Sequence, residues 1–203
     1  GIASTVRAAQ RRAASSASGS SDVLEQLGLR LPLDELAAGR CLAATGFTFL
    51  FAPHYHPAMK EIAPVRRALG VRTVFNLLGP LTNPAEPPFG LIGAYSRDAA
   101  RLMAETLAGM PIQRVFVVHG EPGWDEPTPC GPFELYDATP GHVVRTERDP
   151  LDYGLARCTP QSLAGGEAVH NAVGMRAVFT GQDRGPHRAA LVLNAALALE
   201  VTG

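Results

Sequence analysis

The chain has 203 residues, of which 46% are hydrophobic and 18% are charged. This composition is sufficient for one well-filled domain, and it excludes a chain that is disordered throughout. The formal net charge of -1 excludes the global basic excess of typical nucleic-acid-binding proteins.

The cysteine content and the hydropathy of the chain indicate the cellular location of the protein. The three cysteines, Cys41, Cys130 and Cys158, are widely spaced and odd in number, so they predict neither a zinc site nor a disulfide framework. A reducing, cytoplasmic location is the simplest inference. No apolar run is long enough to span a membrane and no signal peptide is visible, so we expect no membrane partner.

The first 22 residues are rich in arginine and serine. Arg7, Arg11 and Arg12 form a small basic cluster that fits either a solvated terminus or contact with phosphate. Small hydroxyl residues surround Gly19 in the block Ser15–Asp22, which a helix beginning at Asp22 follows. Such a block is either a loop that caps the helix or a site where backbone N–H groups approach an anion.

Hydrophobic periodicity, together with the positions of glycine, proline and capping residues, predicts alternating strands and helices along the rest of the chain. Strands are expected at Phe47–Phe51, Phe89–Tyr95, Arg114–His119, Gly131–Ala138 and His142–Glu147. Helices are expected at Asp22–Leu27, Leu33–Ala44, Pro57–Leu69, Thr73–Leu78, Asp98–Gly109, Gly166–Phe179 and Pro186–Val201. Asp34 and Gly46 should cap the second helix, and Gly79-Pro80 should break the fourth. The fold class is therefore α/β, with a mainly parallel sheet flanked by helices.

Two groups of residues in this pattern could carry chemistry. His54 and His56 precede the helix that contains Arg66; we favour turn and surface roles for the histidines, because no third ligand completes a metal site. The loop after Arg114–His119 contains Asp125 and Glu126, at the edge where open α/β sheets bind ligands. It is either an exposed acidic turn or a Mg²⁺ site. Asn171 and Asn194 are interpreted as structural hydrogen bonders.

Four blocks together resemble the anthranilate phosphoribosyltransferase family. They are Ser15–Asp22, the Phe47–Pro84 region, Gly123-Trp124-Asp125-Glu126, and Leu163–Glu167 with Asn171. The resemblance implies the large α/β domain of the nucleoside phosphorylase/phosphoribosyltransferase-like fold. It also implies transfer of a phosphoribosyl group from 5-phosphoribosyl diphosphate to anthranilate, in tryptophan biosynthesis.

The resemblance also assigns roles to individual residues. Ser15, Ser16 and Ser20 would contact the phosphates with Arg12 nearby, Arg66 would bind the anthranilate carboxylate through its guanidinium fork, and Asp125 and Glu126 would hold Mg²⁺. No side chain is expected to act as a nucleophile.

The chain also departs from the family pattern. Ala8-Ala9-Gln10-Arg11-Arg12 stands where the family has Lys-His-Gly-Asn-Arg, so only Arg12 matches. The family's Gly-Thr-Gly-Gly-Asp diphosphate loop and Asn-x-Ser-Thr element do not occur in the chain. We therefore expect residues 1–203 to be a single α/β domain truncated at both ends, without the N-terminal helical domain that makes the family's dimer interface.

These departures leave two other functions open. One is a related transferase or phosphorylase that uses another acceptor. The other is a non-catalytic paralogue that binds a ligand, or nucleic acid through Arg7, Arg11 and Arg12; the near-neutral charge argues against nucleic acid.

Overall fold

The structure is a computed structural model that describes residues 18–56 and 75–203. These residues form two units. The sheet unit comprises Pro87–Ala164 and Ala177–Gly203, and the helical unit comprises the described residues up to Glu86 together with Gly165–Arg176. The expectation of a single domain stays a prediction.

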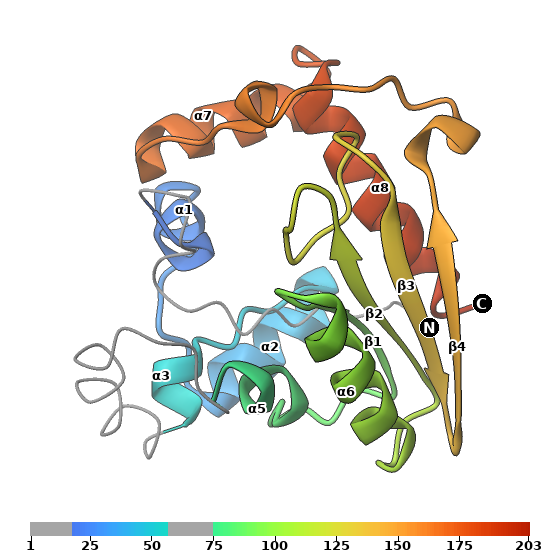
Figure 1. Cartoon of the computed structure of the whole chain (residues 1–203). Helices are drawn as coiled ribbons and strands as arrows, with labels where there is room; N and C mark the ends of the chain where they lie inside the picture. The colour runs from blue at the N-terminus through green and yellow to red at the C-terminus, as the bar shows by residue number, and fades with distance from the viewer. Residues whose placement is uncertain (1–17, 57–74) are drawn as a thin grey trace, which may run out of the picture. The chain divides into compact units, whose positions relative to one another are not determined.

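The sheet unit is built on four strands in the order β1-β2-β3-β4 (Figure 1). Their bounds are Phe89–Gly93, Arg114–Gly120, Phe133–Thr139 and His142–Arg148. The β1 and β2 strands are parallel and joined through helix α6 (Arg97–Ala108), as expected for a βαβ unit. The β3 and β4 strands form an antiparallel hairpin across residues 139–141.

The α/β class is confirmed, but the expectation of a mainly parallel sheet is wrong for the described strands. Only β1 and β2 run parallel; β3 is antiparallel to β2, with Val117 opposite Tyr136, and β4 is antiparallel to β3. The connection between β2 and β3 explains the difference. It is a loop without a crossover helix, so β3 returns alongside β2 in the reverse direction.

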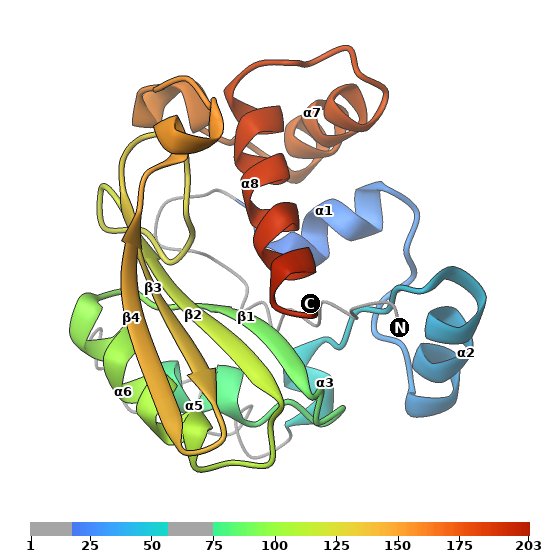
Figure 2. The ribbon, with the colours of Figure 1, turned by 90° about the vertical axis from the view of Figure 1, so that its right-hand side faces the viewer.

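Helices cover both faces of this sheet, as Figures 1 and 2 show from two directions. On one face, α8 (Pro186–Glu200) packs Leu193 and Leu197 against Phe116, Val118 and the facing residues of β3. The opposite face lies under α6, whose Ala100, Met103 and Ala104 are almost completely buried. Strand alternation requires this division, because successive side chains of a strand point to opposite faces.

The helical unit contains short helices whose ends follow local sequence signals. The described ones are α1 (Ser20–Gln26), α2 (Glu35–Thr45), α3 (Ala52–Tyr55), α5 (Phe75–Leu81) and most of α7 (Ala168–Phe179). As predicted, Asp34 caps α2 by accepting a hydrogen bond from the Ala37 N–H at 2.7 Å, and Gly46 ends it in the left-handed conformation. Two 3₁₀ turns, η1 (Pro150–Tyr153) and η2 (Pro160–Leu163), belong to the sheet unit.

Several local predictions need correction. Residues 47–51 do not form the predicted strand and pair with no described strand, although Phe49 and Leu50 are buried. Helix α5 continues through Gly79-Pro80 to Leu81, because Pro80 lies in the last turn, where only one intrahelical bond is lost. Helix α1 begins at Ser20 rather than at Asp22, and Gly19 is its N-cap.

The two C-terminal helices behave differently. Helix α8 packs on the sheet, whereas α7 has only Ala172 buried and exposes Val169, Val173 and Phe179. The predicted helix at residues 57–69 lies outside the described residues. Among the helices of the described ranges, none is long and apolar enough to cross a membrane.

Candidate functional site

The acidic loop of the sheet unit connects β2 to β3 and begins with a tight turn. The N–H groups of Gly123 and Trp124 both donate to the Gly120 carbonyl at 2.9 Å, and the Gly120 N–H donates to the Trp124 carbonyl at the same distance. Gly123 has a φ of 109°, which glycine adopts without strain. This turn brings Asp125 and Glu126 back over the ends of the strands.

Two glycines make this close approach possible. A Cβ added to Gly93, at the end of β1, would overlap the carbonyl oxygen of Asp125. A Cβ added to Gly120, at the end of β2, would overlap the carbonyl oxygen of Glu126. Any larger residue would push the loop outward, so the backbone of the acidic pair rests directly on the carboxyl ends of the two parallel strands.

The second half of the loop is held by buried prolines and by α8. Pro127, Thr128 and Pro129 are fully buried. Asn194 of α8 donates from Nδ2 to the Pro127 carbonyl at 2.8 Å, which confirms the structural role predicted for this residue. The Glu121 N–H donates to the Pro132 carbonyl at 3.1 Å and closes the base of the loop. A loop anchored this way presents its polar residues from a fixed support.

The acidic pair has suitable chemistry for Mg²⁺. Asp125 is exposed and Glu126 is half-buried. Residues 18–56 and 75–203 contain no group of three or more His, Cys, Asp and Glu side chains that could hold a metal ion. Mg²⁺ does not require such a group, because it commonly takes one or two carboxylates and completes its octahedron with water and substrate phosphate. The donor set therefore fits a magnesium ion that arrives with a phosphorylated ligand.

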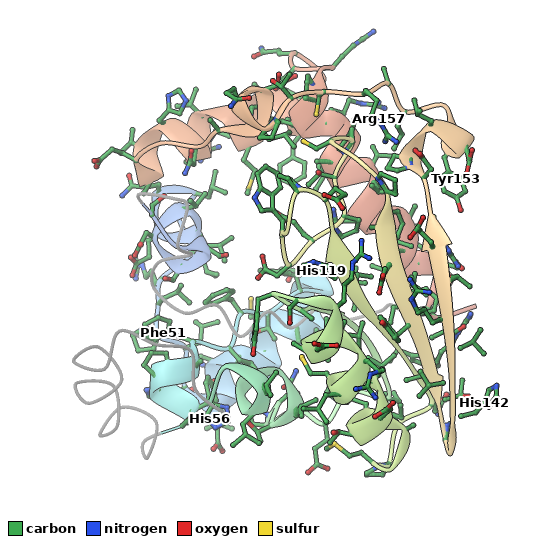
Figure 3. The ribbon with its side chains drawn as sticks, viewed as in Figure 1. Phe51, His56, His119, His142, Tyr153 and Arg157 are labelled. Carbon is green, nitrogen blue, oxygen red and sulfur yellow. The ribbon has the colours of Figure 1, made fainter. Side chains whose placement is uncertain are left out.

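His119 lies at the end of β2, beside this loop (Figure 3). Its Nδ1 is 2.8 Å from the Ala94 carbonyl oxygen. Because the carbonyl can only accept, Nδ1 carries a proton and donates. The side chain thus joins the ends of β1 and β2, and its neutral form leaves Nε2 as an acceptor.

A buried carboxylate, Glu134, lies next to His119 in the hydrogen-bonded register of β2 and β3. Arg145 donates to it at 2.7 Å, Tyr136 donates at 2.9 Å, and Arg97 Nε lies 3.3 Å away. The hydrogen bond from Arg145 is the main cause that lowers the pKa of Glu134 below the ordinary glutamate value, while burial acts in the opposite direction. Glu134 and Arg97 also line a small hollow at the base of the acidic loop, whereas Asp125 and Glu126 do not.

The serine block is described from Ser18 onward and belongs to the helical unit. The Gly19 N–H donates to Asp22 Oδ2 at 2.9 Å, and Ser20 is the first residue of α1. Asn171 Nδ2 donates to Ser18 Oγ at 3.0 Å and its Oδ1 accepts from the Gly166 N–H at 2.7 Å. Asn171 thereby ties the serine block to the segment before α7, which confirms its predicted structural role.

The structure thus tests the placement of only some predicted site residues. Arg12, Ser15, Ser16 and Arg66 lie outside the described residues. Ser20 lies in the helical unit, and Asp125 and Glu126 are adjacent in the sheet unit. Of the two histidines, His54 is exposed and packs edge-on against Tyr55 with ring centroids 5.2 Å apart, and His56 ends α3.

Sequence reasoning missed the residues that support the acidic loop. Gly93 and Gly120 follow apolar strand residues, and a glycine at the carboxyl end of a predicted strand was a usable signal of close backbone approach. Glu134 gave another signal, because it is the one charged residue in the apolar run Phe133–Tyr136. The contact between Cys130 and Cys158 has no local signal, since 27 residues separate them in the sequence.

Known proteins resemble this chain in sequence over nearly its whole length. The profile of the "Glycosyl transferase family, a/b domain" matches residues 3–203. An anthranilate phosphoribosyltransferase from Chloroflexus aggregans is 44% identical over 200 residues, which cover 98% of this chain and 59% of the relative. The chain therefore spans about three-fifths of the length of this curated relative.

Solved structures also resemble the whole chain. The crystal structure of anthranilate phosphoribosyltransferase from Thermus thermophilus has a TM-score of 0.88 and 39% identity, over 99% of this chain and 59% of that one. The enzyme from Saccharomyces cerevisiae in complex with PRPP and Mg has a TM-score of 0.82 and 25% identity, over 96% of this chain and 53% of that one. These matches confirm the family resemblance found in the sequence.

Proposed function

The chain belongs to the glycosyl transferase family, of which it spans the α/β domain, and we propose that it serves the transfer of a phosphoribosyl group to anthranilate. The donor would be 5-phosphoribosyl diphosphate, and the products would be N-(5-phosphoribosyl)anthranilate and diphosphate. The observation that carries this proposal is the pair Asp125 and Glu126, fixed over the carboxyl ends of two parallel strands. The names of the relatives supply the acceptor.

Asp125 and Glu126 would hold Mg²⁺ in this reaction. The ion would neutralise charge that develops on the leaving diphosphate. The chain's own contribution is a fixed position: Gly93 and Gly120 seat the loop, and Asn194 holds its second half. A support that does not reorganise during the reaction stabilises the leaving group more than mobile carboxylates would. A yeast relative crystallised with PRPP and Mg supports this role.

The residues of the serine block would bind phosphate. Ser20, with Ser15, Ser16 and Arg12, supplies hydroxyl and guanidinium donors, and Arg66 would pair with the anthranilate carboxylate. No side chain is proposed as a nucleophile, because the amine of anthranilate attacks the ribosyl carbon itself. Catalysis would come from positioning the two substrates and from stabilising the leaving group.

The altered segment Ala8–Arg12 favours a second function, transfer to another acceptor. The family's Asn in this element, at the position of Arg11, would contact anthranilate, so a cation there suits an acceptor with more negative charge. The third function is non-catalytic binding of a ligand. For each function we propose a cytoplasmic location, consistent with cysteines that are free thiols.

A diphosphate-release assay on the purified chain tests the proposal. Release should require both anthranilate and Mg²⁺, and the Asp125→Ala/Glu126→Ala variant should lose about 100-fold or more of the rate. Release with another aromatic acid or base, and none with anthranilate, would favour the second function. Binding of 5-phosphoribosyl diphosphate without release with any acceptor would favour the non-catalytic role.

A further inference from the structure

Two cysteines of the sheet unit lie in direct contact. Cys130 Sγ is 3.7 Å from Cys158 Sγ, and both side chains are half-buried. Cys130 is near the end of the acidic loop, and Cys158 lies in the segment between η1 and η2. The third cysteine, Cys41, belongs to the helical unit.

One backbone hydrogen bond joins these two segments independently of the thiols, and a second, local hydrogen bond fixes the end of the acidic loop. The Cys158 N–H donates to the Pro129 carbonyl at 3.3 Å, and the Cys130 N–H donates to Thr128 Oγ1 at 3.3 Å. Arg157, labelled in Figure 3, forms an ion pair with Asp149 that holds the neighbouring segment. The hydrogen bond from residue 158 to the residue before Cys130 keeps the two segments adjacent, and the two Sγ atoms lie 3.7 Å apart.

We infer that Cys130 and Cys158 form a reversible disulfide that fastens the acidic loop to the segment before η2. The Sγ atoms need to approach by less than 2 Å to reach bonding distance, which side-chain rotation and small shifts at the loop end can supply. This inference does not depend on the proposed transferase function. It assigns to the loop a redox-sensitive site that the magnesium role does not include.

The oxidant would be a small disulfide such as oxidised glutathione. The Cys130 thiolate attacks one sulfur of that disulfide, forms a mixed disulfide and releases one small thiolate. The Cys158 thiolate then attacks the Cys130 sulfur and releases the second. The two protein thiols give up two electrons and two protons, and the small disulfide is reduced to two thiols, so atoms and electrons balance.

The surroundings of Cys158 favour it for the second of these steps. Burial, with the hydrogen bond to Cys130, raises the pKa of Cys158 to about 11. Cys158 therefore forms thiolate less readily, which suits it to the second, intramolecular step, where proximity compensates for a small thiolate fraction. Both steps should accelerate as the pH rises, because each requires a thiolate.

Trp124 provides a reporter within the same loop. It is the single tryptophan of the chain and is half-buried six residues before Cys130. Fastening the loop end should restrict the loop and change the surroundings of the indole ring. Closing a loop across 27 intervening residues should also stabilise the folded chain by restricting the unfolded state.

The experiment uses the full chain with Cys41→Ser, so that only the two thiols remain, incubated with oxidised glutathione under native conditions. After alkylation, the intact mass of the oxidised chain should show no added alkyl group and no bound glutathione. It should be about 2 Da below the mass of the reduced, unalkylated chain. The melting temperature should rise by about 5 °C or more, the Trp124 emission should shift, and reduced glutathione should reverse all three changes.

Cys130→Ser and Cys158→Ser in the same background are the matched controls, and neither should gain melting temperature from oxidation. A stable glutathione adduct on the two-thiol chain, without closure, would overturn the inference. So would thiols that stay free in the folded chain but react in urea, or a closed form that melts at a lower temperature than the reduced one.

Discussion

At the scale of single residues, Glu134 shows how a buried charge is kept in the sheet. Its side chain is only 4% exposed, yet it receives hydrogen bonds from Arg145 and Tyr136. Glu134→Gln keeps the shape and removes the charge, so we expect the free energy of unfolding at pH 7 to fall by about 1–2 kcal/mol. Urea unfolding measures this change. Glu105→Gln, in the exposed helical pair with Arg101, should change it by less than about 0.5 kcal/mol.

The same residue predicts a pH dependence. Arg145 first, then Tyr136 and Arg97, lower the pKa of folded Glu134, against the opposing effect of burial. A lowered folded-state pKa gives stability that is fully present above the unfolded-state pKa of about 4.3 and is lost as the pH falls through the folded-state value. Urea midpoints measured from pH 7 to pH 3 should therefore fall less steeply below pH 4.3 in Glu134→Gln than in the wild type. Parallel curves would contradict this reasoning.

Gly93 predicts the outcome of adding a single methyl group. Gly93→Ala would place its Cβ on the carbonyl oxygen of Asp125 and displace the acidic loop. We expect a loss of about 1–3 kcal/mol in stability together with weaker Mg²⁺-dependent ligand binding. Gly39→Ala is the control, because nothing lies within 4 Å of its added Cβ in the middle of α2; it should stabilise the chain by about 0.5–1 kcal/mol. Calorimetric melting of the Gly93→Ala and Gly39→Ala variants measures both changes in stability.

At the scale of elements, α8 is coupled to the acidic loop through one amide. Asn194 Nδ2 donates to both the Pro127 and Ala190 carbonyls, and an aspartate there would turn a donor into a carboxylate facing two carbonyl oxygens. Asn194→Asp should therefore loosen the loop and change the Trp124 emission, while the helix signal in circular dichroism stays. Asn83→Asp is the matched control, since Asn83 Oδ1 accepts from the Ala85 N–H and an aspartate can still do so. Equal emission in both variants would contradict the coupling.

Elements with their own start and stop signals could be predicted from the sequence. Asp34 and Gly46 bound α2, and apolar runs on either side of α6 define β1 and β2. The direction of β3 could not be predicted, because the same apolar pattern serves a parallel or an antiparallel strand and only the path of the β2–β3 loop decides. Phe47–Phe51 has strand composition, but its Phe49 and Leu50 are buried without ladder pairing to a described strand.

At the scale of the whole molecule, the candidate site could be predicted only where the chemistry is local. Asp125 and Glu126 are neighbours in the sequence, so the family pattern locates them directly. The contacts that hold them are not local, because Gly93, Cys158 and Asn194 meet the loop from distant parts of the chain. Sequence periodicity carries no information about such contacts, which depend on how the strands and α8 pack.

In the proposed function, the acidic loop binds Mg²⁺ together with 5-phosphoribosyl diphosphate. Calorimetric titration of the chain with this ligand, with and without Mg²⁺, tests it most directly. We predict binding that requires Mg²⁺, is abolished in Asp125→Ala/Glu126→Ala, and persists in Glu105→Ala/Asp152→Ala, which removes two exposed carboxylates elsewhere in the sheet unit. Binding of equal strength without Mg²⁺, or unchanged binding in the Asp125→Ala/Glu126→Ala variant, would contradict the claim.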